Sequence, residues 1–354
     1  MKSVTIELHR RSSRRYGDRL PFKRGSGLAP RRQMNWRYKA LLQAFLSHLP
    51  AGHSFNYLFR RYVTRTVPAS SSVQMTGYSF AADYVSTFAT YGSIPLEKAI
   101  FYEFGVGWDL MIPFSLYSLG INHQIVTDLR RLVRSELVAH TIETFAALKL
   151  EPAPIRLPRL CLSRANGREL DGLLREYYGI DYRAPFDART TGFPCGSVDY
   201  VTATMVLSYI PVTVLREILR ECHRVLRPGG MMSVLMDYRD EYSYFDSKIS
   251  VYNLLQYSDK VWELLYNPPL NYQNRLRHSD FKNLFTGAGF EVERDEPGYD
   301  GTIEEARALL ASVPLAKRFR AYDPDDLAAV RGVFVLRKSS RRHHQKVTPG
   351  RSET

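Results

Sequence analysis

The sequence predicts an α/β fold in which a doubly wound, mostly parallel sheet ends in a C-terminal antiparallel hairpin. From about residue 98 onward, short apolar runs typical of buried strands alternate with segments of helical period. This alternation indicates a parallel sheet with helices on both faces. Two late apolar runs, 289–295 and 332–338, have the pattern of the closing hairpin. N-terminal helices are expected before the sheet, and a helical, aromatic-rich insert is expected at 238–285.

The first predicted element is a helix over 38–49, which Pro50 and Gly52 end. Its apolar residues recur at helical spacing, at Tyr38, Leu41, Leu42, Phe45, Leu46 and Leu49. A helix of this kind with flanking Lys and Arg could lie weakly on a membrane surface, but packing against the main domain is the commoner use. A short mixed segment follows at 55–68, and the polar run at 70–74 resembles a linker.

The main domain is expected to begin at residue 76. Its pattern predicts strands at 99–105, 123–128, 197–210 and 231–238, and helices at 113–120, 129–148 and 212–226. A short apolar piece at Leu160 could add a strand, and residues 175–188 are expected to end a helix and continue as a loop at the sheet edge. The chain then divides into a basic disordered arm, a helical extension, the main domain and a basic disordered tail, at 1–35, 36–75, 76–338 and 339–354.

The positive charge of the chain is concentrated in its two ends. The net charge is +13, of which residues 1–37 carry +9 and residues 337–354 carry +5, so the remainder is near neutral. Basic arms poor in apolar residues act more often as solvated tails or electrostatic tethers than as specific readers of nucleic acid. Without a folded basic stripe, no specific nucleic-acid partner is expected.

Several other classes of protein are disfavoured. No apolar run approaches the roughly 20 residues of a membrane-spanning helix, and residues 1–37 lack the apolar core of a secretory signal, so we expect a cytoplasmic protein. The three cysteines, Cys161, Cys195 and Cys222, are scattered without a partner at metal-ligand spacing. Reduced thiols are expected, with neither a disulfide framework nor a metal site.

The segment that carries most chemical information is Glu103 to Leu110, directly after a predicted strand. Gly105 and Gly107 allow a tight turn that brings the backbone close to a ligand. Asp128 lies 21 residues beyond Gly107, at the end of the next strand, where a carboxylate can bind ribose hydroxyls. The pair indicates an adenosine-containing cofactor and leaves its identity open, so an NAD-dependent oxidoreductase stays an alternative.

Two further segments discriminate between cofactors. Asp187-Ala188 precedes a predicted buried strand. Arg227-Pro228-Gly229-Gly230 is expected to end a helix, and this second segment therefore has a mainly structural role. With these four ordered motifs, the sequence over about 99–238 resembles the class I S-adenosylmethionine methyltransferases, in particular the methyltransferase type 11 family. The sequence of residues 103–110 is also similar to that of an uncharacterised subgroup of methyltransferases with an N-terminal helical extension. The resemblance implies a Rossmann-like fold and S-adenosylmethionine as cofactor.

Position by position, the resemblance implies that Glu103, Gly105 and Gly107 cradle the methionine moiety. Asp128 would bind the ribose, and Thr204 would lie below the sulfonium. The remaining implied cofactor-binding residues are Asp187 and Ala188 at the adenine, with Phe104, Trp108 and Leu129 beside the turn and the ribose. Two departures from the family pattern are present: Asp109 replaces the usual third glycine, and Ser208-Tyr209 stands where the family often has Glu-His.

The methyl acceptor is not identified by the sequence and could be a small metabolite, a glycan or a lipid-linked intermediate. For a hydroxyl acceptor, which needs a base, the candidates are Tyr209, Tyr272 and His278. The aromatic insert could close over the acceptor or simply pack onto the sheet, and residues 267–278 are the candidate substrate mouth. A non-catalytic cofactor-binding scaffold is a second alternative function, and the oligomeric state is left open.

Overall fold

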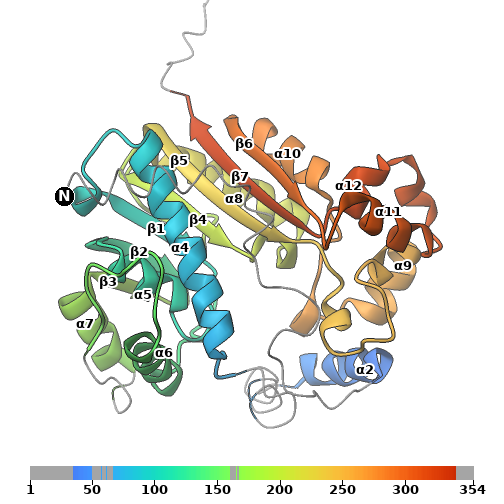
Figure 1. Cartoon of the computed structure of the whole chain (residues 1–354), viewed down its shortest axis with the longest axis horizontal. Coiled ribbons are helices and arrows are strands. Elements are labelled where there is room, and N and C mark those ends of the chain that lie inside the picture. The colour runs from blue at the N-terminus through green and yellow to red at the C-terminus, as the bar shows by residue number, and fades with distance from the viewer. Residues whose placement is uncertain are drawn as a thin grey trace, which may run out of the picture.

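The computed structural model describes residues 35–49, 57, 61, 67–159, 165 and 167–339 (Figure 1). Seven strands form one sheet in the order β3-β2-β1-β4-β5-β7-β6. The first five pair in parallel and the last two antiparallel, which confirms the predicted α/β fold with its closing hairpin. The strands are β1 (Ile100–Phe104), β2 (His123–Thr127), β3 (Ile180–Arg183), β4 (Val198–Thr204), β5 (Leu226–Asp237), β6 (Phe290–Gly298) and β7 (Arg331–Lys338).

Helices cover both faces of the sheet. Because side chains alternate along a strand, neighbouring residues of β1 enter different cores: Phe101 packs with the α4 and α5 side, and Tyr102 with the α8 and α10 side. The longer helices are α2 (Trp36–Ser47), α4 (Ser71–Tyr91), α5 (Met111–Ser118), α6 (Ser135–Ala147), α7 (Gly167–Tyr178), α8 (Val212–Val225) and α10 (His278–Gly287). Within the described residues, no helix combines the length and the apolar character needed to cross a membrane.

Helix α4 corrects the predicted linker at 70–74. The polar run belongs to the first turn of a 21-residue helix, and its Gln74 is fully buried. Farther along α4, Phe88 packs against Phe101 of β1 and Tyr200 of β4, with ring centroids 5.3 and 5.5 Å away. Tertiary packing therefore stabilises a helix whose local sequence is typical of a loop.

Strand β3 corrects the predicted loop over 175–188. Residues 180–183 pair in parallel with β2 at the edge of the sheet. Four residues are too short to show a strand period, so this strand depends on the neighbour that it pairs with. Most of the arms, most of 55–68, and Leu160 with Cys161 lie outside the described residues. Cys195 and Cys222 are free thiols.

Beyond β5 the chain forms a cap that has its own apolar core. The segment after β5 contains the short turns η5 (Glu241–Tyr244), η6 (Asn253–Gln256), α9 (Asp259–Val261), η7 (Trp262–Tyr266) and η8 (Pro269–Asn271). An unpredicted second insertion between β6 and β7 contains α11 (Ile303–Ala311), η9 (Lys317–Ala321) and α12 (Pro324–Ala328). Trp36 of α2, Tyr242, Trp262 and Phe319 are buried together there, so these aromatics of the insert serve packing.

The Arg227–Gly230 segment is structural but does not end the helix as predicted, because α8 ends at Val225 and the segment forms the start of β5. Arg227 forms an ion pair of 2.5 Å with Asp199 of β4, and the other oxygen of Asp199 accepts a hydrogen bond from the backbone N–H of Ile100. The start of β5 is thus tied through β4 to the start of β1.

Candidate active site

The two positions after β1 that hold glycine require it for different physical reasons. Both have positive φ, 75° at Gly105 and 74° at Gly107, which favours glycine. A Cβ at Gly105 would overlap the side chain of Val206 in the loop after β4, so this position is fixed by packing. A Cβ at Gly107 would meet nothing within 4 Å, so the backbone there faces open space that a ligand can use.

Asp109, which replaces the third glycine of the family pattern, has a local role. Its Oδ1 accepts a hydrogen bond of 3.2 Å from the backbone N–H of Met111, at the beginning of α5. The preceding Trp108 stacks on Tyr57, with ring centroids 5.2 Å apart. In place of a third glycine, the turn therefore has a side-chain contact to the first residue of α5 and an aromatic stack.

Asp128 joins the glycine turn to the end of β2. Its Oδ2 accepts from the N–H of Gly107 and its Oδ1 from the N–H of Arg130, both at 3.2 Å. Burial raises the pKa of Asp128 while these backbone donors lower it. Each oxygen keeps a further lone pair, so the carboxylate can still accept from ribose hydroxyls. The adjoining Leu129 is 65% exposed.

Glu103 is the most strongly perturbed carboxyl group at this edge of the sheet. It is 3% exposed, and burial raises its pKa to about 8 although Thr204 donates to Oε1 at 3.0 Å. Thr204 also contacts the hydroxyl of Tyr84 on α4 at 3.0 Å. No group in the described part of the chain hydrogen-bonds Glu103 Oε2. A buried, unpaired carboxylate oxygen fits a cationic ligand group such as the ammonium of a methionine moiety.

The predicted adenine residues lie beside Asp128 but are differently engaged. The N–H of Phe186 donates to the carbonyl of Asp128 at 2.9 Å, which brings this loop to the end of β2. The Asp187 carboxylate binds the guanidinium of Arg189 at 2.7 Å, and this pairing lowers its pKa. Ala188 is half-buried and keeps its place on the same loop. Phe104, by contrast, sends its side chain into the core behind the sheet.

The structure does not support His278 as a free base. Its Nδ1 hydrogen-bonds the hydroxyl of Tyr238 at 2.9 Å, its Nε2 hydrogen-bonds Asp295 at 2.5 Å, and its ring stacks on Phe334. Burial lowers the pKa of this histidine. Both ring nitrogens are engaged, one by the residue that follows β5 and the other by a residue of β6, so neither is available to an acceptor.

The predicted substrate mouth at 267–278 is also corrected. Asn274 donates to the carbonyls of Leu207 and Ile210, and Arg277, 1% exposed, donates to the carbonyls of Tyr238, Leu327 and Ala329. Irregular buried backbone needs such donors. The polar side chains that looked like a binding surface therefore hold the cap onto the sheet. Tyr272 is half-buried in this segment, and burial raises its pKa, with a smaller increase from Glu263 and a decrease from Arg318.

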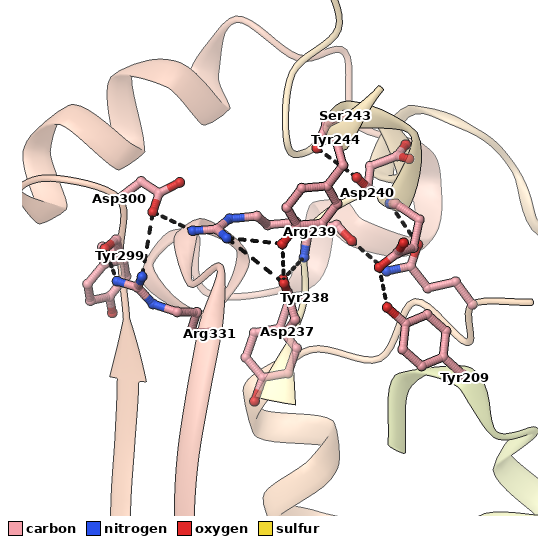
Figure 2. Close-up of polar contacts among 12 residues, drawn as sticks. Tyr209, Asp237, Tyr238, Arg239, Asp240, Ser243, Tyr244, Tyr299, Asp300 and Arg331 are labelled. Atoms are coloured by element: carbon pink, nitrogen blue, oxygen red, sulfur yellow. Dashed lines mark hydrogen bonds and ion pairs between the residues drawn. The ribbon is translucent and has the colours of Figure 1, made fainter. Parts of the chain in front are cut away.

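A polar cluster lies beyond the ends of β4 and β5 (Figure 2); it contains the predicted candidate Tyr209 together with residues that the sequence did not predict. Tyr209, in the loop after β4, donates to Glu241, and Tyr244 donates to Asp237 at the end of β5. Arg239 donates a hydrogen bond of 3.1 Å to the hydroxyl of Tyr244 and forms an ion pair of 2.6 Å with Asp300. Thr204 and Leu235 are register partners, so Asp237 lies only two residues past the level of Thr204 on the adjacent strand.

Sequence reasoning missed Tyr84, Asp237, Glu241 and Tyr244 as site residues. Asp237 was detectable in principle, because the carboxyl ends of parallel strands bind ligands at the point where the strand order reverses. That reversal lies between β1 and β4 here. The other three depend on which loops meet, which no local pattern reveals.

The comparison with protein families identifies the chemistry. Residues 162–234, from α7 through most of β5, match the methyltransferase type 11 family, which is described as a methyltransferase domain. The chain carries a methyltransferase domain. This match decides against the oxidoreductase alternative that the glycine turn and Asp128 had left open. The matched range contains Asp187, Ala188 and Thr204 of the methyltransferase but begins after Glu103 and Asp128.

Solved structures similar to this chain share little of its sequence, as three of them illustrate. A putative sarcosine dimethylglycine methyltransferase from Galdieria sulphuraria is 14% identical over 76% of this chain and 87% of its own, with a TM-score of 0.41. A putative methyltransferase from Bacillus halodurans is 15% identical over 73% and 99%, with a TM-score of 0.38. Phosphoethanolamine N-methyltransferase 2 from Haemonchus contortus, solved with S-adenosylhomocysteine, is 14% identical over 84% and 60%, with a TM-score of 0.44. A search of curated proteins gave no match.

Proposed function

We propose that this methyltransferase binds S-adenosylmethionine along the ends of β1, β2 and β4 and transfers its methyl group to an acceptor held by the polar cluster beyond β4 and β5. The observation that carries the proposal is the pair of tyrosine–carboxylate contacts, Tyr209 with Glu241 and Tyr244 with Asp237, next to the level of Thr204. These contacts provide polar groups at the ends of β4 and β5, whereas Glu103 and Asp128, which would bind the cofactor, lie at the ends of β1 and β2.

The residues present fit the cofactor. Glu103 would pair with the ammonium of the methionine moiety through its unpaired oxygen, and Asp128 would accept the ribose hydroxyls. Gly107 leaves the space between them open. Ala188 offers a backbone contact to the adenine, whereas the Asp187 carboxylate must share its charge with Arg189. When bound, S-adenosylmethionine supplies an electrophilic methyl group, and the protein contributes chiefly by holding the acceptor in line with it.

Within the polar cluster, the carboxylate is a better proton acceptor than the phenol. Burial of its hydroxyl and the neighbouring carboxylates Glu241 and Asp237 hold the pKa of Tyr209 far above its ordinary value. A phenol that is difficult to ionise serves as a hydrogen-bond donor that orients its partner. We therefore assign the proton-accepting role to Glu241 and the positioning role to Tyr209, for an acceptor whose N–H or O–H must lose a proton on methylation.

Incubation with methyl-labelled S-adenosylmethionine and fractionated cell extract tests the proposal. The parent protein is expected to transfer label to an extract component, and Glu241→Gln is expected to reduce transfer by about 100-fold or more. The variant should keep its affinity for S-adenosylhomocysteine. Glu293→Gln, which alters a surface ion pair with Arg337 on the hairpin, is the matched control.

Two outcomes contradict the proposal. Cofactor binding without any extract-dependent labelling would favour the non-catalytic scaffold. Full activity of Glu241→Gln would place the acceptor elsewhere on the sheet edge. Once a labelled product is isolated, its structure decides among a small metabolite, a glycan and a lipid-linked intermediate.

A further inference from the structure

Helix α2 buries Trp36, Ala40 and Leu46 but also presents apolar residues on the side that faces away from the protein. Its buried side includes Lys39 and Gln43, which are 3% and 4% exposed. On the opposite side, Tyr38, Leu41 and Phe45 are 69%, 61% and 64% exposed. The last three residues follow one another at spacings of three and four, so they form a single stripe along the helix.

The contacts of the buried side fix this orientation. The backbone N–H of Trp36 donates to Asp246 Oδ2 at 3.2 Å, and the ammonium of Lys39 lies 2.9 Å from the centre of the Phe245 ring. At the other end of α2, Ser47 accepts a hydrogen bond from the N–H of Leu270. Rotating the helix to bury its apolar stripe would break all of these contacts, so the exposed stripe is a fixed feature of the cap.

A second group of exposed apolar side chains lies on the element beside α2. Val261, Leu264 and Leu265 are 38%, 83% and 47% exposed, and they lie at the end of α9 and on η7. Helix α2 packs against η7 and η8, and Figure 1 shows it next to α9 at the lower right. Together the two groups form what we call the α2 patch. Exposed apolar side chains gathered in this way mark an interaction surface.

The charge of the adjoining chain indicates which surface the α2 patch meets. Residues 1–37, which lead directly into α2, carry a net charge of +9. Lys260 and Glu263, near the patch on α9 and η7, offset each other. An apolar helical stripe with an adjoining polybasic segment combines the two signals that bind proteins to anionic membranes. Two copies of the chain would instead bring two strongly positive segments together, which disfavours self-association through this face.

We propose that the α2 patch docks on an anionic lipid bilayer, with Tyr38, Leu41 and Phe45 entering the interface and the basic segment 1–37 attracted to the lipid headgroups. The helix would lie in the plane of the surface, because its opposite side is held by the cap. This inference is independent of the proposed acceptor chemistry.

Flotation of the full-length protein with lipid vesicles tests the docking. The probe is phosphatidylcholine vesicles containing phosphatidylserine, compared with phosphatidylcholine alone. The triple variant Tyr38→Gln, Leu41→Gln, Phe45→Gln replaces the apolar stripe with glutamine, which has good helix propensity. Ile155→Gln, Tyr177→Gln, Leu309→Gln removes three exposed apolar residues elsewhere, which are 66%, 52% and 37% exposed, and is the matched control.

The parent and the control triple are expected to bind the phosphatidylserine vesicles, and the α2 triple to bind about tenfold or more weakly. Arg10→Gln, Arg11→Gln, Arg14→Gln, Arg15→Gln in the full chain, or added salt, should also weaken binding. Circular dichroism and S-adenosylhomocysteine affinity verify that the variants are folded. Parent protein that fails to bind, or an α2 triple that binds as well as the parent, would overturn the proposal. So would a concentration-dependent dimer that the α2 triple abolishes, because a second copy would then cover the patch.

Discussion

Thr204 of β4 donates a hydrogen bond of 3.0 Å to Glu103 of β1 across the point where the strand order reverses. A threonine hydroxyl has one proton, so when Glu103 is ionised the hydroxyl of Tyr84 must be the donor to Thr204. The chain of donors therefore runs from helix α4 through the sheet to the proposed cofactor edge. It ends on a carboxyl group with one oxygen unpaired in the described structure.

The first prediction concerns the pH dependence of cofactor binding. Because burial raises the pKa of Glu103 to about 8, the carboxyl group is mostly protonated below that pH in the free protein. A cationic ligand favours the ionised form, so binding releases a proton and affinity rises as the pH approaches 8. Below pH 8 the loss should be up to about tenfold per pH unit. Calorimetry with S-adenosylhomocysteine between pH 6 and 8.5 measures it.

Glu103→Gln should bind weakly and without this pH dependence, and the exposed Glu97→Gln should behave as the parent. An unchanged pH profile in Glu103→Gln would mean that another group is responsible for the proton release.

The second prediction concerns the ribose carboxylate. Asp128→Ala removes an acceptor for two ribose hydroxyls and for the N–H of Gly107, and hydrogen bonds to charged groups contribute about 1.5–3 kcal/mol. The affinity for S-adenosylhomocysteine should fall by about 10- to 150-fold. Titration calorimetry gives the number, and circular dichroism establishes that the fold survives. Asp109→Asn, which only alters the start of α5, should retain near-parent affinity. The reverse ranking of the two variants would place the ribose ligand elsewhere.

The third prediction concerns α4. Tyr84→Phe leaves the buried ring in place but removes the hydroxyl that contacts Thr204. The free energy of unfolding should decrease by about 0.5–1.5 kcal/mol, the usual contribution of one intramolecular hydrogen bond. Urea denaturation measures the change. Tyr91→Phe, at the exposed end of the same helix, serves for comparison and should be neutral. Equal stabilities of Tyr84→Phe and the parent would show that this contact contributes nothing to folding.

The fourth prediction concerns acid stability. Burial lowers the pKa of His278 in the folded protein, so the unfolded chain binds the extra proton more readily. The stability from this group is complete above the unfolded pKa of about 6.5 and is lost as the pH falls below it. The parent should therefore lose up to about 1.4 kcal/mol per pH unit through this residue between pH 6.5 and its lowered folded pKa.

Chemical denaturation at several pH values tests this dependence. His278→Gln should be less stable than the parent at pH 8 because it loses the contacts to Tyr238 and Asp295, but its stability should change less with pH. The exposed His123→Gln should retain the slope of the parent. A slope in His278→Gln as steep as that of the parent would assign the acid sensitivity to other groups.

Local sequence determined the elements whose pattern is complete within a few residues. Two patterns were predictable from local sequence. Strands buried on both faces, as β1, β2, β4 and β5 are, read as continuous apolar runs, and a helix buried on one face, as α8 is, repeats its apolar residues at helical spacing. The proposed cofactor edge was predictable for a related reason: a glycine turn after one strand and a carboxylate after the next are placed together by the parallel sheet itself. Gly107 and Asp128 are therefore in hydrogen-bond contact, as their positions in the chain suggested.

The tertiary structure alone decided the features that depend on distant partners. Strand β3 exists because β2 lies beside it, and α4 is stabilised by the packing of Phe88 against strands β1 and β4. His278 was a candidate base at the end of the predicted substrate mouth, yet Tyr238 and Asp295 engage both of its ring nitrogens. The proposed acceptor cluster joins residues from the loop after β4 and from the cap, more than thirty positions apart in the case of Tyr209 and Glu241. A sequence pattern records spacing along one segment, whereas a buried hydrogen bond between segments depends on where the packing of the whole chain places them.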